Sequence, residues 1–147
     1  MTTTLTGHLI HKELLDQLGA IDQWWPDASQ PTVSAMNARE VLVRLTELRD
    51  TLKDHFANEE EHGLLPDNDT NAPRLETKAD QLQKQHEELL QRLSTVIMTV
   101  PVTNENPSAW SAAKGHFEDF RKQLERHERE EIDLVQTASG VNLGVGD

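Results

Sequence analysis

Apolar residues recur at alternating steps of three and four residues along four long segments of the chain. Clusters rich in Pro, Gly, Asn and Asp separate these segments, namely PDASQP from residue 26, GLLPDNDTNAP from residue 63 and PVTNENP from residue 101. Such spacing places the apolar side chains on one face of a helix. The pattern predicts four helices, near residues 4–25, 33–63, 73–100 and 107–137, and a flexible tail over 138–147.

The predicted helices are long and joined by short connections, so neighbouring helices should pack antiparallel. Their apolar stripes are narrow seams of the kind that close a four-helix bundle. The two halves of the chain also resemble each other, because HKELLDQL at 11–18 returns as HEELLQRL at 86–93, and LKDH at 52–55 returns as LERH at 124–127. We expect a single all-α domain over residues 1–147, an up-down-up-down antiparallel four-helix bundle with a pseudo-twofold internal repeat.

Each seam is apolar except at one end, where it carries His, or His followed four residues later by Glu. The six residues are His11, His55, Glu59, His86, His127 and Glu131. In an up-down-up-down bundle the starts of the first and third helices meet the ends of the second and fourth, so all six side chains should share one layer. A buried ionised Glu is costly unless it finds a partner or a metal. Two divalent metal ions bridged by Glu59 and Glu131 would use all six residues.

The remaining histidines and the neighbouring acids are weaker candidates. His8 lies one turn before His11, and His62 continues the seam of the second helix, so both are possible additional metal ligands. His116 falls beside the seam and is expected at the surface. Four acids are expected to form a solvated rim, although any of them could hold the ring of a ligand His: Glu60, Glu61, Glu128 and Glu130.

The pattern H…HxxxE…H…HxxxE resembles the hemerythrin-like, HHE cation-binding family. The residues that carry the resemblance are His11, HFANE at 55–59, His86 and HEREE at 127–131, and the stretch HFANEEEHGLLP is also typical of that family. The resemblance covers about residues 5–135. It implies an up-down four-helix bundle that holds a non-haem di-iron centre.

The sequence departs from the oxygen-carrying hemerythrins at two positions. Leu90 stands where those proteins have a second His in the third helix, and Ile132 stands at the position of their Asp, one residue after Glu131. One imidazole is therefore missing, unless His8 or His62 replaces it. A centre with fewer imidazoles has more open positions for water, peroxide or another small ligand. The departures disfavour reversible oxygen carriage and favour sensing or redox chemistry.

Composition excludes several other functions. The chain has 26 Asp and Glu against 14 Lys and Arg, for a net charge of −12, which disfavours nucleic acid and anionic membranes as partners and attracts cations. The absence of Cys excludes disulfides, thiolate metal sites and a thiol nucleophile. HExxH, phosphate-loop and GxSxG motifs are absent, and the start of the chain does not resemble a signal peptide. We expect a cytoplasmic protein.

Histidine and carboxylate ligands without sulfur suit Fe, Mn or Zn. A bridged pair with incomplete coordination favours iron at two ions per chain, as the family resemblance does, while Zn and Mn stay open. We expect a protein that binds or reacts with O2, peroxide or NO, as a sensor or scavenger. Whether it is an enzyme, and which redox or signalling partner it has, stay open. The alternatives are an iron-buffering protein and a helical interaction module with a structural metal site.

Overall fold

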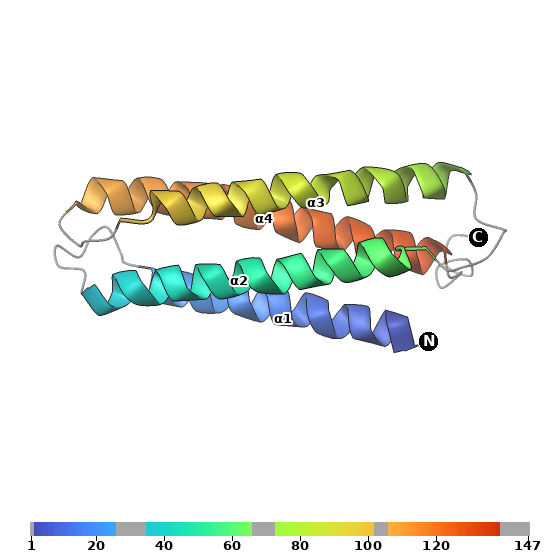
Figure 1. The fold of residues 1–147 in the computed structure, drawn as a ribbon, viewed down its shortest axis with the longest axis horizontal. Coiled ribbons are helices and arrows are strands. Elements are labelled where there is room, and N and C mark those ends of the chain that lie inside the picture. The colour runs from blue at the N-terminus through green and yellow to red at the C-terminus, as the bar shows by residue number, and fades with distance from the viewer. Residues whose placement is uncertain (1, 26–34, 66–72, 102–105, 139–147) are drawn as a thin grey trace.

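The structure is a computed structural model that describes residues 2–25, 35–65, 73–101 and 106–138, without the side chains of residues 2–11, 24, 35–37 and 107. Four helices make up nearly all of it: α1 (Thr2–Trp24), α2 (Ala35–His62), α3 (Pro73–Thr99) and α4 (Pro107–Ala138) (Figure 1). Their ends lie within two residues of those predicted from the sequence. The tail was predicted over 138–147; Ala138 instead ends α4, and residues 139–147 lie outside the described residues.

The four helices alternate in direction along one common axis, so that the start of α1 and the end of α4 lie at the same end of the bundle (Figure 1). Close backbone approaches join α1 to α2, α2 to α3, α3 to α4 and α4 to α1. The all-α, up-down-up-down bundle predicted from the seams is therefore confirmed. Among the described helices, none is both long enough and apolar enough to cross a membrane.

Local signals at the helix ends explain where the helices begin and end. Pro73 and Pro107 occupy first helical positions, where a missing backbone N–H costs nothing. Asn106 caps α4, since its Oδ1 accepts a hydrogen bond from the backbone N–H of Ala109 at 3.1 Å. Gly63 follows α2 with φ of 77° and donates its N–H to the carbonyl of Glu59 at 2.6 Å. That left-handed conformation is typical of a glycine that ends a helix.

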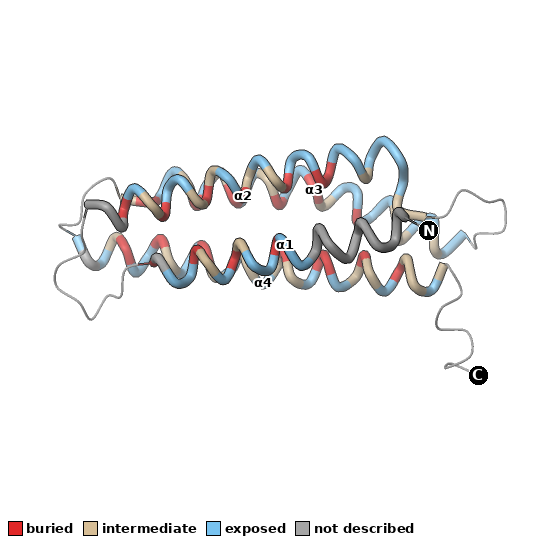
Figure 2. The backbone as a smooth tube through the Cα atoms, turned by 90° about the horizontal axis from the view of Figure 1, so that it is seen from below, coloured by how far each residue is buried: buried red, intermediate tan, exposed pale blue. Residues whose placement is uncertain are grey.

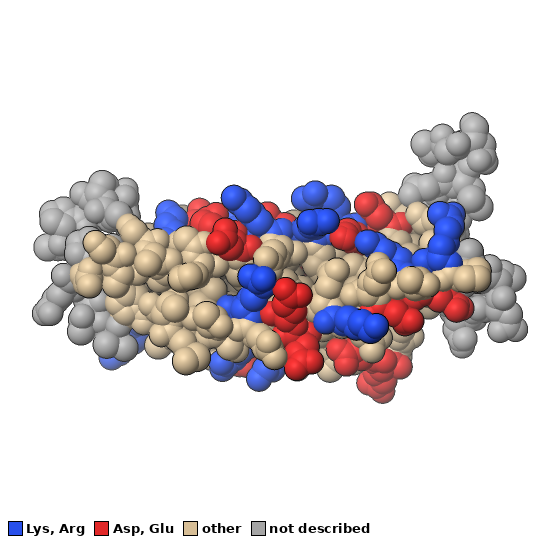
Figure 3. Space-filling model, turned by 90° about the horizontal axis from the view of Figure 1, so that it is seen from above, with Lys and Arg blue, Asp and Glu red and all other residues tan. Residues whose placement is uncertain are grey.

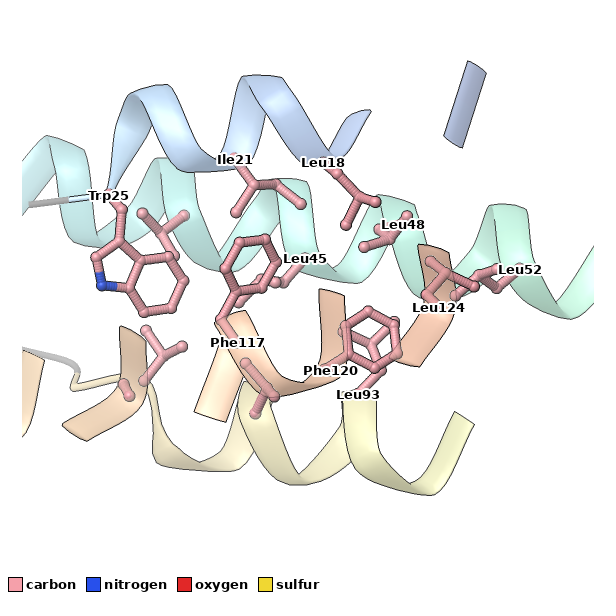
Figure 4. Packing of buried hydrophobic residues seen from close by; sticks show 14 of the residues in the cluster. Leu18, Ile21, Trp25, Leu45, Leu48, Leu52, Leu93, Phe117, Phe120 and Leu124 are labelled. Atoms are coloured by element: carbon pink, nitrogen blue, oxygen red, sulfur yellow. The ribbon is translucent and has the colours of Figure 1, made fainter. Parts of the chain in front are cut away.

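The buried residues face the bundle axis from all four helices (Figure 2). They follow the predicted seams, for example Leu14, Leu18 and Ile21 on α1 and Leu45, Leu48 and Leu52 on α2 (Figure 4). At the end opposite the chain termini, the Trp25 ring stacks on Phe117 with centroids 5.3 Å apart and meets Trp110 edge-on at 5.9 Å. Aromatic packing therefore closes one end of the core.

Charged side chains of both signs are intermixed along the face seen in Figure 3, whereas its left-hand end is largely uncharged. Sequence accounts for this difference, because α3 after Arg92 and α4 before Lys114 contain no Asp, Glu, Lys or Arg. On this face of α3 and α4, the charged side chains therefore lie toward the end of the bundle that holds the polar ends of the seams.

Candidate metal centre

Five of the six predicted ligand residues have described side chains, and the structure brings all five together. His55 and Glu59 come from α2, His86 from α3, and His127 and Glu131 from α4. The i, i+4 spacing places each His and its Glu on one face of their helix. His55, His86, His127 and Glu131 are buried, and Glu59 is nearly so.

The carboxylate of Glu59 lies between two imidazoles. Its Oε2 is 3.1 Å from His55 Nε2, and its Oε1 is 3.1 Å from His86 Nε2. Each of its oxygens therefore faces a different histidine. A carboxylate in this arrangement can join two ions that are bound on either side of it.

The carboxylate of Glu131 is placed in the same way from the opposite helix. Its Oε1 is 3.7 Å from His55 Nε2, while its Oε2 is 2.7 Å from His127 Nε2 and 3.4 Å from His86 Nε2. The potential ligand atoms fall into two groups, and within each group all of these atoms lie within 4.8 Å of one another. One group consists of Glu59, His86, His127 and Glu131, and the other of His55, Glu128 and Glu131. Glu131 belongs to both groups.

Glu128 was expected on a solvated rim, and that expectation is wrong. Glu128 is only 3% exposed, and its Oε1 lies 3.4 Å from His55 Nε2. The sequence does hold a signal for this burial. Glu128 lies four residues after the buried Leu124, so the two side chains share a row beside the seam. Strict alternation of three and four residues follows the seam through His127 and passes over this position.

Outer hydrogen bonds fix the rings of two histidines. His86 Nδ1–H donates to Glu60 Oε2 at 3.0 Å, and His127 Nδ1–H donates to Gln85 Oε1 at 2.8 Å. Since both acceptors are oxygens, a proton is placed on Nδ1 of each ring, and Nε2 faces the inner carboxylates. This is the arrangement that metal-binding histidines ordinarily have.

Phe56 shields the inner side of the cluster. Its ring stacks on His86 with centroids 3.9 Å apart and an interplanar angle of 5°, and it meets His127 edge-on at 5.6 Å. The stacking keeps water away from one face of His86 and restricts rotation of both rings. A polar cleft of about 280 Å³ lies between α3 and α4, and Gln85, Arg126 and His127 help to line it.

The close carboxylates shift the pKa values of the histidines. Burial alone would lower the pKa of His55, but its close contacts with the Glu128 and Glu131 carboxylates and the charge of Glu59 outweigh burial and raise that pKa to about 10. Burial likewise opposes the charge on His86, whose pKa is nevertheless raised to about 10 by Glu131, Glu59 and Glu60. Positive charge is therefore strongly favoured at both positions.

The pKa values of Glu59 and Glu131 shift in opposite directions. Burial, and then the nearby Glu131, raise the pKa of Glu59 to about 8, although His86 opposes this shift. Burial would also raise the pKa of Glu131, but its contacts with His127, His55 and His86 hold it well below the usual range. A carboxylate that is surrounded by three imidazoles stays ionised, and its neighbour carries the proton.

The inner atoms fit a metal ion better than they fit one another. Within the described part of the chain, His55 Nε2, His127 Nε2 and Glu59 Oε1 are buried and make no hydrogen bond. An imidazole lone pair and a carboxylate oxygen repel each other unless a proton or a cation lies between them. Buried polar atoms without hydrogen bonds are uncommon and need such an explanation. The cluster is therefore a buried set of His and Glu groups that can hold metal ions.

The other predicted residues either have side chains outside the described part of the chain or are exposed. His8 and His11 lie in α1, but their side chains are outside the described residues. His62 is exposed, and its Nδ1–H donates to the backbone oxygen of Asn58 at 3.0 Å. His116 is exposed, as predicted.

Comparison with protein families gives one match, to the Hemerythrin HHE cation binding domain, over residues 7–138. Neither the curated proteins nor the solved structures give a significant match. The matched region runs from within α1 to the end of α4 and contains every residue of the His and Glu cluster. The chain therefore belongs to the hemerythrin HHE cation-binding domain family.

Proposed function

We propose that this protein is a non-haem di-iron protein that binds or reacts with O2, peroxide or NO, as a sensor or scavenger. The observation that carries the proposal is the placement of Glu59 and Glu131. Each carboxylate directs one oxygen toward His55 and the other toward His86, and Glu131 also reaches His127. Two carboxylates placed between two sets of imidazoles suit a pair of bridged ions better than a single ion.

The division of ligands follows from these contacts. His86 and His127 would hold one ion, and His55 would hold the other together with His11, which the seam of the first helix predicts as its partner. Glu59 and Glu131 would bridge the two. Ligands of this kind, without sulfur, suit iron, zinc or manganese. A pair of iron ions supplies the exchange of two electrons with O2 or peroxide, which zinc does not.

The surrounding residues of the chain have separate tasks in this proposal. Glu60 and Gln85 orient the rings of His86 and His127, and Phe56 keeps water from the inner face of His86. The polar cleft between α3 and α4 gives a small ligand a route toward His127. The net charge of −12 favours the approach of cations.

The test is anaerobic loading with Fe(II), followed by metal counting and absorption spectra before and after O2 is added. We expect two iron ions per chain and a near-ultraviolet charge-transfer band that shifts with azide or peroxide. His55→Ala and Glu131→Ala should each reduce iron below two per chain, whereas the surface variant His116→Ala should retain both.

Two outcomes would replace the proposal. Weakly held, exchangeable iron without any spectral response to O2 indicates an iron-buffering protein. A melting temperature that is indifferent to chelators indicates a helical module whose site is structural or unused, because a metal that is bound on folding stabilises the fold. Full retention of iron by the Glu131→Ala variant would contradict the bridging role.

A further inference from the structure

We propose that Glu128 is a terminal metal ligand, which binds the ion held by His55 and has no contact with the ion held by His86 and His127. This inference rests on the proposed two-metal centre and assigns one more of its ligands. His55, Glu128 and Glu131 form a separate group whose ligand atoms lie within 4.8 Å of one another. Ligands about 2.0–2.2 Å from one ion lie no more than roughly 4.4 Å apart, so the spacing is close to that of a formed site.

Burial is the first argument for a ligand role. The side chain of Glu128 is 4% exposed and that of His55 is 6% exposed, in a layer that already contains Glu131 at 7%. Taking a third carboxyl group out of water next to two others needs positive charge nearby, and His55 at 3.4 Å is where that charge would lie, as a proton in the metal-free protein and as an ion in the loaded one. A divalent ion on His55 supplies that charge.

The side of the imidazole that Glu128 faces is the second argument. A carboxylate that only orients a ligand histidine binds the outer nitrogen, as Glu60 does when it accepts from His86 Nδ1–H. Glu128 instead lies 3.4 Å from Nε2 of His55, the nitrogen that also faces Glu59 and Glu131. It is therefore on the ligating side of His55.

The assignment makes the two metal positions unequal. The ion on His55 gains a carboxylate oxygen, whereas the group with His86 and His127 contains no donor beyond Glu59 and Glu131 among the described residues. Leu90, one turn after His86, supplies none. The more open position is thus the one whose His127 lines the cleft between α3 and α4. We expect a small ligand to bind on that side.

Anaerobic titration with Co(II) tests the assignment, because its visible absorption reports the ligands of each ion. The wild type should bind two equivalents. Glu128→Gln and Glu128→Leu should bind one of the two equivalents as the wild type does and the other at least about tenfold more weakly, since even outer residues of metal sites contribute that much. Glu125→Gln is the matched control, because Glu125 lies on the same helix and pairs with Arg121 at 3.3 Å.

A crystal structure of the Co(II)-loaded wild type keeps the test independent of how the variants fold. A Glu128 oxygen about 2.0–2.2 Å from the ion on His55 supports the assignment, and one beyond roughly 3 Å overturns it. Unchanged affinity for both equivalents in both variants also overturns it. A wild type that binds only one Co(II) contradicts the proposed two-metal function itself, which is a different failure.

Discussion

His86 and His127 each use their two nitrogens differently, and their outer partners are not equivalent. His86 Nδ1–H donates to a carboxylate, Glu60, whereas His127 Nδ1–H donates to the neutral amide of Gln85. A carboxylate acceptor makes the opposite nitrogen a stronger donor than an amide acceptor does. His86 should therefore contribute more to metal affinity than His127, although both belong to the same ligand group.

Glu60→Gln should weaken metal binding by about 10-fold or more, the effect typical of an outer carboxylate on a ligand histidine. The substitution keeps the hydrogen bond to His86 but removes the negative charge. The loss of metal affinity therefore reports the basicity of the His86 ring and not its position. Zn(II) affinity measured by competition with a chromophoric chelator checks the effect. Glu61→Gln is the control, since Glu61 is the exposed neighbour on α2. Equal affinities in the two variants would show that Glu60 does not tune the site.

The raised pKa values predict how the metal-free protein responds to pH. His55 and His86 have pKa values of about 10 and Glu59 one of about 8, each above its unfolded value. A group whose pKa is raised by folding stabilises the fold at low pH and loses that contribution as pH rises through the folded value. The melting temperature of the metal-free protein should thus fall between about pH 6.5 and 10.

Metal-loaded protein should show a smaller fall over the same range, because bound ions replace those protons. Loading at neutral pH should release protons, which calorimetry in buffers of different ionisation enthalpy measures. At acid pH the stability should change in the opposite direction. Because folding lowers the pKa of Glu131, its contribution to the stability of the fold is lost as pH drops below about 4.5. A metal-free protein whose melting temperature rises between pH 6.5 and 10 would contradict the assigned ionisation states.

Residue spacing predicted most of the cluster, and its one failure has a physical cause. His55, His86, His127 and Glu131 are buried where the seams placed them, since a polar residue on an otherwise apolar stripe must point inward. Glu128 was missed because the buried stripe of a helix is wider than a single row of residues. In the acidic run HEREE, the sequence alone does not distinguish the carboxylate that turns inward.

At the scale of the helices, the breaker residues predicted the ends well because each acts through its own backbone. Pro73 and Pro107 start helices through a fixed φ, and Gly63 ends α2 through a positive φ. Side-chain contacts between helices had no comparable local signal. Pairs such as His127 with Gln85, or Lys78 with Glu130 at 3.1 Å, depend on the register between α3 and α4, which spacing within one helix does not fix.

Gly63→Ala should destabilise the protein by about 1–2 kcal/mol, the cost of placing an L side chain in the left-handed region. No atom lies within 4 Å of an added Cβ at this position, so the loss is one of backbone conformation and not of packing. Urea unfolding of the metal-loaded protein measures it. Metal stoichiometry should stay unchanged, because Gly63 follows the last turn of α2.

Gly115→Ala provides the matched comparison. Gly115 is exposed within α4 and also has open space around an added Cβ, but its φ is not positive. Alanine should therefore stabilise this helix by about 0.5–1 kcal/mol. The two substitutions have the same chemistry and opposite expected signs. Destabilisation by both would indicate that the helix ends are not formed as described.

For the whole molecule, the core and the metal cluster occupy different parts of one bundle. Trp25, Trp110 and Phe117 pack at one end, and His127 lies about 25 Å farther along α4 than Trp110, at 1.5 Å per residue. Apolar burial holds the four helices together at the first end. At the other, the seams contain carboxylates and imidazoles, which would hold the ions of the proposed centre between them.

Removal of the metal should therefore destabilise the molecule unevenly. At free metal 100-fold above Kd, each site adds about 2.7 kcal/mol, which corresponds to roughly 5–10 °C in melting temperature for a chain of this size. Chelation should lower the melting temperature by at least this amount. Hydrogen exchange should accelerate first near His55, His86 and His127, since the side chains there then lose the ions that the proposed centre places between them.

Amides near Trp110 and Phe117 should keep their protection after chelation, because the aromatic contacts there involve no ligand residue. Tryptophan fluorescence under native conditions should likewise stay close to that of the loaded protein. Leu45→Ala provides the opposite pattern: removing a fully buried side chain at the apolar end should cost about 2–5 kcal/mol and leave metal stoichiometry unchanged. Uniform acceleration of exchange along all four helices on chelation would instead mean that the metal centre holds the whole bundle together.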